Sequence, residues 1–221
     1  MKTAILVDGG FFRKRASHLW QYEKAEELAQ ILQEYCWGHI KQSNNKHKGD
    51  PFDLYRIFYY DCPPSDKKVF HPLLQKQIDL KKTEAYAWNL EFFHELKKRR
   101  KFALRMGTLS DMQSYYTIRY DIVKKLYHKS LCLEDLTERD FELHMEQKGV
   151  DMRIGLDIAS LAYKRQVEQI ILISGDSDFV PAAKLARREG IDFILDPLWA
   201  PIKDDLYEHI DGIRSCIKKP L

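Results

Sequence analysis

A run of four apolar residues, 170–173, leads directly into the sequence Ser-Gly-Asp-Ser-Asp-Phe at residues 174–179. An apolar run this short is typical of a strand that is buried on both faces of a parallel sheet. The apolar face of a helix follows at the spacing i, i+3, i+4, i+7, formed by Phe179, Ala182, Ala183 and Ala186. Asp176 and Asp178 are therefore expected where a buried strand gives way to a helix, which is where open α/β sheets bind ligands.

A second strand of this kind is predicted over residues 3–7, and it too ends at an aspartate, Asp8, followed by two glycines. Further strands are predicted at residues 53–60, 102–106 and 191–195, with helical patterns between most of them. Such an alternation implies right-handed crossovers and an α/β sandwich of three layers around a central, mostly parallel sheet. Because parallel strands end at one edge of the sheet, we expect Asp8, Asp176 and Asp196 to converge there.

The length of 221 residues suits a single domain, residues 1–221, with a sizeable core. Helical periodicity predicts a helical insertion at about 65–101, and a C-terminal tail is expected at about 197–221, with a short helix near 204–209. Another helix is predicted from the spacing of Tyr115, Ile118, Ile122 and Leu126. Alternating apolar residues at 141–145 indicate a strand or an extended arm.

Charge and cysteine content limit the partners and the compartment. The net charge is only +3, so a binding site for nucleic acid has to be a local basic patch. The four cysteines are scattered and form no metal-ligand motif, which is typical of a reducing compartment. We find no apolar run that predicts a signal peptide or a membrane span, so we expect a cytoplasmic protein that does not bind membranes.

Four aspartates in these motifs can be explained in two ways: Asp8, Asp151, Asp176 and Asp178. Gathered together they would repel one another, and a hard divalent cation such as Mg²⁺ or Mn²⁺ would relieve that repulsion. Alternatively they cap helices, since Asp151 and Asp178 each precede a predicted helix. Asp8 and Asp176 are harder to explain as caps, because no helix is predicted to start directly after them. The four together therefore favour a metal site.

Several basic and hydroxyl residues near these motifs are candidates for contact with a phosphate: Arg13, Lys14, Lys148, Ser174 and Ser177. The basic run at residues 97–101 could also guide a nucleic acid, although such runs are more often a solvated helix end. Lys148 could equally be a solvated lysine. The eight histidines show no zinc-binding spacing.

Three motifs together resemble the NYN domain, in its LabA-like branch, within the PIN-like nuclease superfamily. They are Ile-Leu-Val-Asp-Gly-Gly at residues 5–10, Lys-Gly-Val-Asp at 148–151 with Asp157 six residues later, and Ser-Gly-Asp-Ser-Asp-Phe at 174–179. The resemblance spans roughly residues 1–196, and the segment 65–101 is less typical of the family. One position departs from the pattern, because Phe11 stands where many family members have asparagine.

The resemblance implies a PIN-like α/β fold and cleavage of RNA that depends on Mg²⁺ or Mn²⁺. It implies that Asp8, Asp151, Asp176 and Asp178 are the catalytic, metal-binding residues, and it carries Asp157 over to the same set. The leading hypothesis is therefore a metal-dependent ribonuclease acting on single-stranded RNA. A catalytically weak RNA-binding regulatory protein and a phosphohydrolase of small substrates remain alternatives, and assembly into homo-oligomers is left open.

Overall fold

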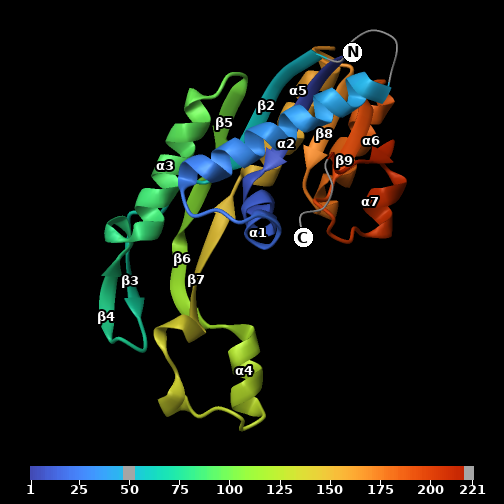
Figure 1. The fold of residues 1–221 in the computed structure, drawn as a ribbon. Coiled ribbons are helices and arrows are strands. Elements are labelled where there is room, and N and C mark those ends of the chain that lie inside the picture. Colours follow the sequence, from blue (N-terminus) through green and yellow to red (C-terminus); the bar gives the residue numbers. More distant parts are fainter. Residues whose placement is uncertain (47–52, 217–221) are drawn as a thin grey trace.

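The computed structural model describes residues 1–46 and 53–216 and shows an α/β sandwich of three layers (Figure 1). A six-stranded parallel sheet forms the middle layer, in the order β10–β9–β8–β1–β2–β5. Its strands are β1 (Lys2–Asp8), β2 (Asp53–Asp61), β5 (Phe102–Met106), β8 (Gln169–Ile173), β9 (Asp192–Asp196) and β10 (Gly212–Ile213). The predicted α/β fold with a central parallel sheet is confirmed.

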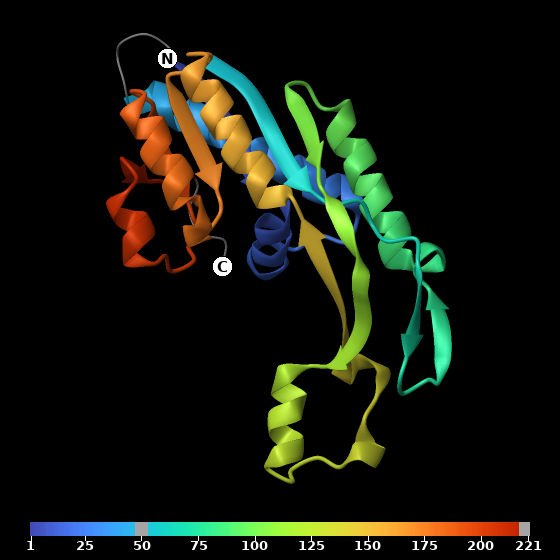
Figure 2. The same ribbon diagram turned by 180° about the vertical axis from the view of Figure 1, so that it is seen from behind.

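Helices cover both faces of the sheet (Figures 1 and 2). One face carries α1 (Gly9–Leu19), α2 (Ala25–Lys46) and α3 (Glu84–Lys98), and the other carries α5 (Val150–Tyr163), α6 (Val180–Arg188) and α7 (Asp204–Glu208). Strand β1 contributes Ile5 and Val7 to the first core and Ala4 and Leu6 to the second. Successive side chains of a strand point to opposite faces, which explains why both central strands are continuously apolar.

The segment between β2 and β5 is only partly helical, in contrast to the helical insertion predicted at about 65–101. It begins with a hairpin of β3 (Lys68–His71) and β4 (Lys76–Asp79), continues through the 3₁₀ turn η1 (Leu80–Lys82), and becomes α-helical only in α3. Thr83 caps α3 by accepting a hydrogen bond from the Tyr86 backbone N–H at 3.2 Å. The predicted periodicity therefore applies to the second half of the insertion.

A long antiparallel hairpin, β6 (Thr108–Ile118) and β7 (Phe141–Lys148), extends away from the sheet (Figure 2). Between its strands lie α4 (Tyr120–Tyr127) and two 3₁₀ turns, η2 (Leu133–Asp135) and η3 (Glu138–Asp140). We call this whole segment, residues 108–148, the arm. The helix predicted from Tyr115 and Ile118 onward is wrong for that part, because both residues lie in β6. There Tyr115 pairs with His144, with ring centroids 5.0 Å apart. Aromatic cross-strand pairs stabilise a sheet, and this one outweighs the apparent helical spacing. The strand predicted at 141–145 is confirmed as β7.

The end of the chain follows the prediction as far as the structure describes it. The short helix predicted near residues 204–209 is α7, and residues 217–221 of the predicted tail lie outside the described part. Among the described residues, no helix has both the length and the apolar character that crossing a membrane requires.

Gly9, the first residue of α1, is in a place where no side chain fits. A Cβ built there would lie 2.5 Å from the Tyr60 carbonyl oxygen and 2.7 Å from Asp61 Oδ2. We therefore expect Gly9→Ala to lower the free energy of unfolding by roughly 1–3 kcal/mol, the usual cost of overpacking. Gly155→Ala is the matched control, because no atom lies within 4 Å of that position in α5. Urea denaturation checks this, and equal stability of the two variants would contradict it.

Candidate acidic site

The candidate site lies where the strand order of the sheet reverses. From β1 the chain proceeds to β2 and β5 on one side, and later to β8, β9 and β10 on the other. Strands β1 and β8 are therefore neighbours that belong to opposite halves of the sheet, and their carboxyl ends form a topological switch point. Ligands bind at such points in open α/β sheets. Asp8 ends β1, and Ser174 directly follows β8.

Asp8 is held from both sides of this junction. Its Oδ1 accepts a hydrogen bond from the Phe11 backbone N–H at 3.1 Å, and its Oδ2 accepts one from Ser174 Oγ at 3.1 Å. The first bond makes Asp8 the N-cap of α1, so the expectation that no helix starts directly after it was wrong. Capping and metal binding are compatible, since each carboxylate oxygen has two lone pairs.

Asp176 also caps a helical turn, against expectation. Its Oδ1 accepts a hydrogen bond from the Asp178 backbone N–H at 3.0 Å and caps the 3₁₀ turn η4 (Ser177–Phe179), which leads into α6. Asp178 lies within that turn and is not the cap that was predicted for it. Ser174 Oγ accepts a hydrogen bond from the Asp176 backbone N–H at 3.3 Å. Ser174 therefore connects Asp8 to the loop that carries Asp176 and Asp178.

Asp151 lies in the first turn of α5, whose N-cap is Gly149 with a positive φ of 77°. Asp151 is therefore not the cap that the sequence suggested. Asp157 lies six residues further along the same helix, about 240° around its axis. Its Oδ2 accepts hydrogen bonds from Tyr60 Oη at 2.8 Å and Arg105 Nε at 3.1 Å. These contacts turn Asp157 toward β2 and β5, on a different side of α5 from Asp151.

The charges of these aspartates act on one another. Burial raises the pKa of Asp8, and the carboxylates of Asp151 and Asp61 raise it further, against the hydrogen bonds from Phe11 and Ser174. Burial also raises the pKa of Asp151, with additional contributions from Asp176 and Asp178. Asp8, Asp151 and the loop 176–178 therefore form one electrostatically coupled group, and ionising all of it is costly without a cation.

Asp61, at the end of β2, is an acidic residue of this edge that the sequence reasoning did not select. It is fully buried and accepts hydrogen bonds from Arg13 Nη2 at 3.0 Å, Tyr59 Oη at 3.1 Å and its neighbour's backbone N–H. Burial raises the pKa of Asp61, and Arg13 opposes this effect. Its position at a strand end, the property shared by Asp8 and Asp196, is the signal that would have identified it.

Asp196, at the end of β9, does not join the acidic group. Its side chain is fully buried and faces α2, where its Oδ2 accepts a hydrogen bond from Tyr35 Oη at 2.5 Å and lies 2.8 Å from His39 Nε2. Its Oδ1 accepts hydrogen bonds from the Leu198 backbone N–H and from Ser215 Oγ, both at 2.9 Å. These contacts assign Asp196 a structural role that fastens β9 to α2 and to the chain after β10.

The residues predicted to contact phosphate differ in their partners and in their exposure to solvent. Arg13 is paired with Asp61, while Lys14 is exposed on α1. Lys148, at the end of β7, is largely exposed and lies 4.0 Å from Glu146. Ser177 Oγ accepts a hydrogen bond from Lys203 Nζ at 3.2 Å, which brings an unpredicted lysine to the 176–178 loop.

The basic run at residues 97–101 does not serve this site. It leads into β5, so it lies at the amino ends of the parallel strands, and the acidic group lies at their carboxyl ends. Arg99 bonds to Gln30 and Gln33 of α2, and Lys101 pairs with Asp53 at 3.2 Å. The run therefore fastens α3 and β5 to their neighbours, which corrects the expectation that it might guide a nucleic acid.

The acidic group has the chemistry of a site for a hard cation, but its side chains are not arranged around one point. The donors are carboxylates only, the ligand type that Mg²⁺ and Mn²⁺ prefer, and their mutual repulsion favours bound positive charge. Within residues 1–46 and 53–216, however, no three Asp, Glu, His or Cys side chains are gathered closely enough to hold a metal ion. The donor set fits the cation, provided that the side chains turn toward it.

Comparison with known proteins identifies the family. A solved structure of a Vibrio parahaemolyticus protein of unknown function aligns with 96% of this chain and 90% of its own, at 15% identity and a TM-score of 0.47. A search of curated proteins gave no match. Residues 2–198 match the NYN domain family, and this range includes β1, the acidic group and β9. The chain therefore belongs to the NYN domain family, a family of PIN-like nucleases.

Proposed function

We propose that this protein is a ribonuclease that hydrolyses phosphodiester bonds of single-stranded RNA with Mg²⁺ or Mn²⁺, and that it belongs to the LabA-like branch of its family. The observation that carries the proposal is the coupling of Asp8, Asp151 and the 176–178 loop at the switch point of the sheet. Three separate segments of the chain deliver carboxylates there. The capping bonds of Asp8 and Asp176 explain each of those residues singly, but they do not explain why Asp151 and Asp178 add further negative charge to the same place.

Asp8, Asp151, Asp176 and Asp178 would hold the cation, and Asp157 is left out because it is engaged by Tyr60 and Arg105. A divalent ion bound there supplies an activated water and offsets the negative charge that develops on the phosphate. The aspartate side chains are short, so turning them toward an ion immobilises few rotatable bonds.

The surrounding residues hold this arrangement and its substrate. The Ser174 hydroxyl donates a hydrogen bond to Asp8 and accepts one from the Asp176 backbone N–H, which connects the two loops. Arg13 compensates the charge of Asp61, and this limits the electrostatic repulsion between Asp61 and Asp8. Lys14, Lys148 and Lys203 supply positive charge around the site, and we assign them to the phosphates of the RNA strand.

The test is incubation of a fluorescently labelled single-stranded RNA with the protein in Mg²⁺, in Mn²⁺ and in EDTA. We expect cleavage with either metal, no cleavage in EDTA, and a strong loss of cleavage in Asp176→Asn. A wild type without activity in either metal, or an Asp176→Asn variant as active as wild type, would count against the proposal.

A second candidate is an RNA-binding regulatory protein without turnover, and the surroundings of Phe11 favour it. A Cβ built on Gly175 would lie 2.8 Å from Phe11 Cε2, so the Phe11 ring covers the backbone of the second acidic loop. An asparagine there would offer polar groups to the site, whereas this ring offers none. This candidate predicts RNA binding that weakens with salt and does not require a divalent metal.

The raised pKa values predict a dependence of stability on pH. Between the ordinary aspartate value of 3.8 and the raised folded value, the folded state binds more protons than the unfolded state, so stability falls as pH rises. We expect Asp151→Asn to stabilise the metal-free protein at pH 7 by roughly 0.5 kcal/mol, the scale for an exposed charge. This gain should shrink toward pH 4.

Thermal unfolding in EDTA at several pH values measures this effect. Asp53→Asn is the control, because Asp53 is exposed and paired with Lys101, so its loss should stabilise nothing. An Asp151→Asn variant that is less stable than wild type at pH 7 would show that the carboxylate is compensated in the folded state.

A further inference from the structure

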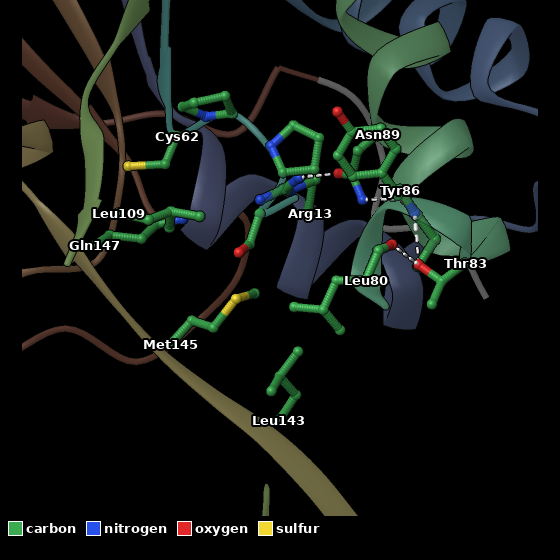
Figure 3. Close-up of a pocket in the computed structure, with 14 residues that line it drawn as sticks. Arg13, Cys62, Leu80, Thr83, Tyr86, Asn89, Leu109, Leu143, Met145 and Gln147 are labelled. Atoms are coloured by element: carbon green, nitrogen blue, oxygen red, sulfur yellow. Dashed lines mark hydrogen bonds between the residues drawn. The ribbon is translucent and has the colours of Figure 1, made fainter. Parts of the chain in front are cut away.

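A cavity of about 150 Å³ lies beside the acidic group, between the insertion and the β6–β7 hairpin. Figure 3 shows Tyr86 and Asn89 of α3 on one side of it and Leu143 and Met145 of β7 on the other, with Arg13 of α1 between the two. The remaining wall comes from the chain after β2, from η1 and from Leu109. Five segments that are distant in sequence therefore line one space.

The cavity adjoins the proposed catalytic edge. Gln147 lines it and donates from Nε2 to Asp61 Oδ1 at 3.3 Å. A Cβ built on Gly10 would lie 3.6 Å from both Asp8 Oδ1 and Gln147 Oε1. The carboxylate of Asp8 and the amide of Gln147 thus both lie next to Gly10. A group held in the cavity can belong to the same strand as a phosphate at Asp8.

The lining combines apolar side chains with polar ones. Leu80, Leu109, Leu143 and Met145 supply apolar surface, and Tyr86 supplies an aromatic ring. Among the polar side chains, Asn89 accepts a hydrogen bond from Arg13 Nη1 and donates one to the Ala85 carbonyl oxygen, which fixes the orientation of its amide. Side-chain amides of asparagine and glutamine present both donors and acceptors, as the edge of a nucleobase does.

The volume limits the size of the occupant. An engineered apolar cavity of about 150 Å³ in another protein binds one benzene ring, so a single six-membered ring fits a space of this size. Sites for larger ligands usually occupy about 300–1,000 Å³. A flat aromatic ring can also stack or pack on the tyrosine, as bases do on aromatic side chains in single-strand-binding proteins.

We propose that this cavity binds one pyrimidine base of the RNA, next to the nucleotide whose phosphate lies at Asp8, and that it gives the enzyme a preference for pyrimidines. The inference rests on the proposed ribonuclease function for its substrate class. In this proposal the side-chain amides of Asn89 and Gln147 form hydrogen bonds with the edge of the base, and the apolar walls pack against its faces. A purine, with its second ring, would extend beyond these walls through the open side of the cavity.

The experiment separates binding of the base from cleavage. Uridine 5′-monophosphate and adenosine 5′-monophosphate are titrated in EDTA into the full chain, and NMR records the Met145 methyl and the Asn89 and Gln147 side-chain amides. Met145→Trp and Leu143→Trp each fill the cavity, and the matched control is Leu133→Trp, at an exposed position on the arm outside the cavity. Unfolding curves establish that each variant is folded.

We expect the uridine nucleotide to shift these signals in wild type and in Leu133→Trp, and to bind at least about tenfold more weakly to a folded cavity-filling variant. The adenosine nucleotide should bind at least about tenfold more weakly than the uridine nucleotide. Equal binding of both nucleotides, no shift at the cavity, or unchanged binding to the filled variants would overturn the inference.

Cleavage of a mixed-sequence RNA by the same variants distinguishes a failure of the base pocket from a failure of the proposed ribonuclease activity. Cleavage without a base preference would refute the pocket and leave the ribonuclease standing. Uridine binding at the cavity without cleavage in Mg²⁺ or Mn²⁺ would support the pocket and refute the ribonuclease.

Discussion

Replacing Asp8 by asparagine is expected to lower the rate of RNA cleavage at least about 100-fold while leaving the fold intact. Asparagine keeps a carbonyl oxygen that can accept the Phe11 N–H, and it is as good an N-cap as aspartate. It lacks the negative charge that a divalent cation requires. The loss should therefore appear in catalysis and not in stability, and initial rates under saturating Mn²⁺ measure it.

Asp121→Asn is the matched control for this experiment. Asp121 is exposed in α4 on the arm, where it pairs only with Arg119 in the described structure at 3.1 Å. Its replacement should leave cleavage within about twofold of wild type, since exposed ion pairs contribute little. If Asp8→Asn and Asp121→Asn cleaved RNA equally fast, Asp8 would have no part in the reaction.

Replacing Asp196 by alanine is expected to lower the free energy of unfolding by about 3 kcal/mol or more, because each buried donor left unsatisfied costs about 1–3 kcal/mol. The reason is the number of groups that the carboxylate satisfies. Tyr35, His39 and Ser215 lose their acceptor, and so does the Leu198 backbone N–H. Burial raises the pKa of Tyr35, so its hydroxyl stays protonated and is left as a buried donor without its acceptor.

Chemical denaturation compares this variant with Asp205→Ala, which removes a largely exposed carboxylate from α7. The control should stay within about 0.5 kcal/mol of wild type, as most surface substitutions do. An Asp196→Ala variant that unfolds at the same denaturant concentration as the control would show that the buried network contributes no stability.

The central sheet was predictable because its strands have a local signature. Residues 4–7 and 170–173 are continuously apolar, and only a strand covered on both faces needs that composition. The aspartates that follow were predictable for the same reason, since strand ends locate the ligand-binding edge. Their capping bonds were not, because a helix that begins at a glycine has no apolar periodicity in its first turn.

The β6 strand of the arm and the cavity could not be predicted, because they depend on pairing between distant segments. Tyr115 and Ile118 share a helical spacing, yet each pairs with β7, some 25 residues further on, and this contact determines the strand. The cavity likewise needs α3 and β7 side by side, which no local pattern indicates. Asp61 ends a predicted strand and could have been selected for that reason, whereas its ion pair with Arg13, on another element, could not be predicted.

Calorimetric titration of the metal-free protein with MnCl₂ tests the central claim most directly, because it asks whether separate aspartates act together on one ion. We predict saturable binding to wild type and to Asp121→Asn, and loss of that binding in the double variant of Asp8→Asn and Asp151→Asn. Saturable binding that survives in the double variant, or its absence from the wild type, would contradict the account.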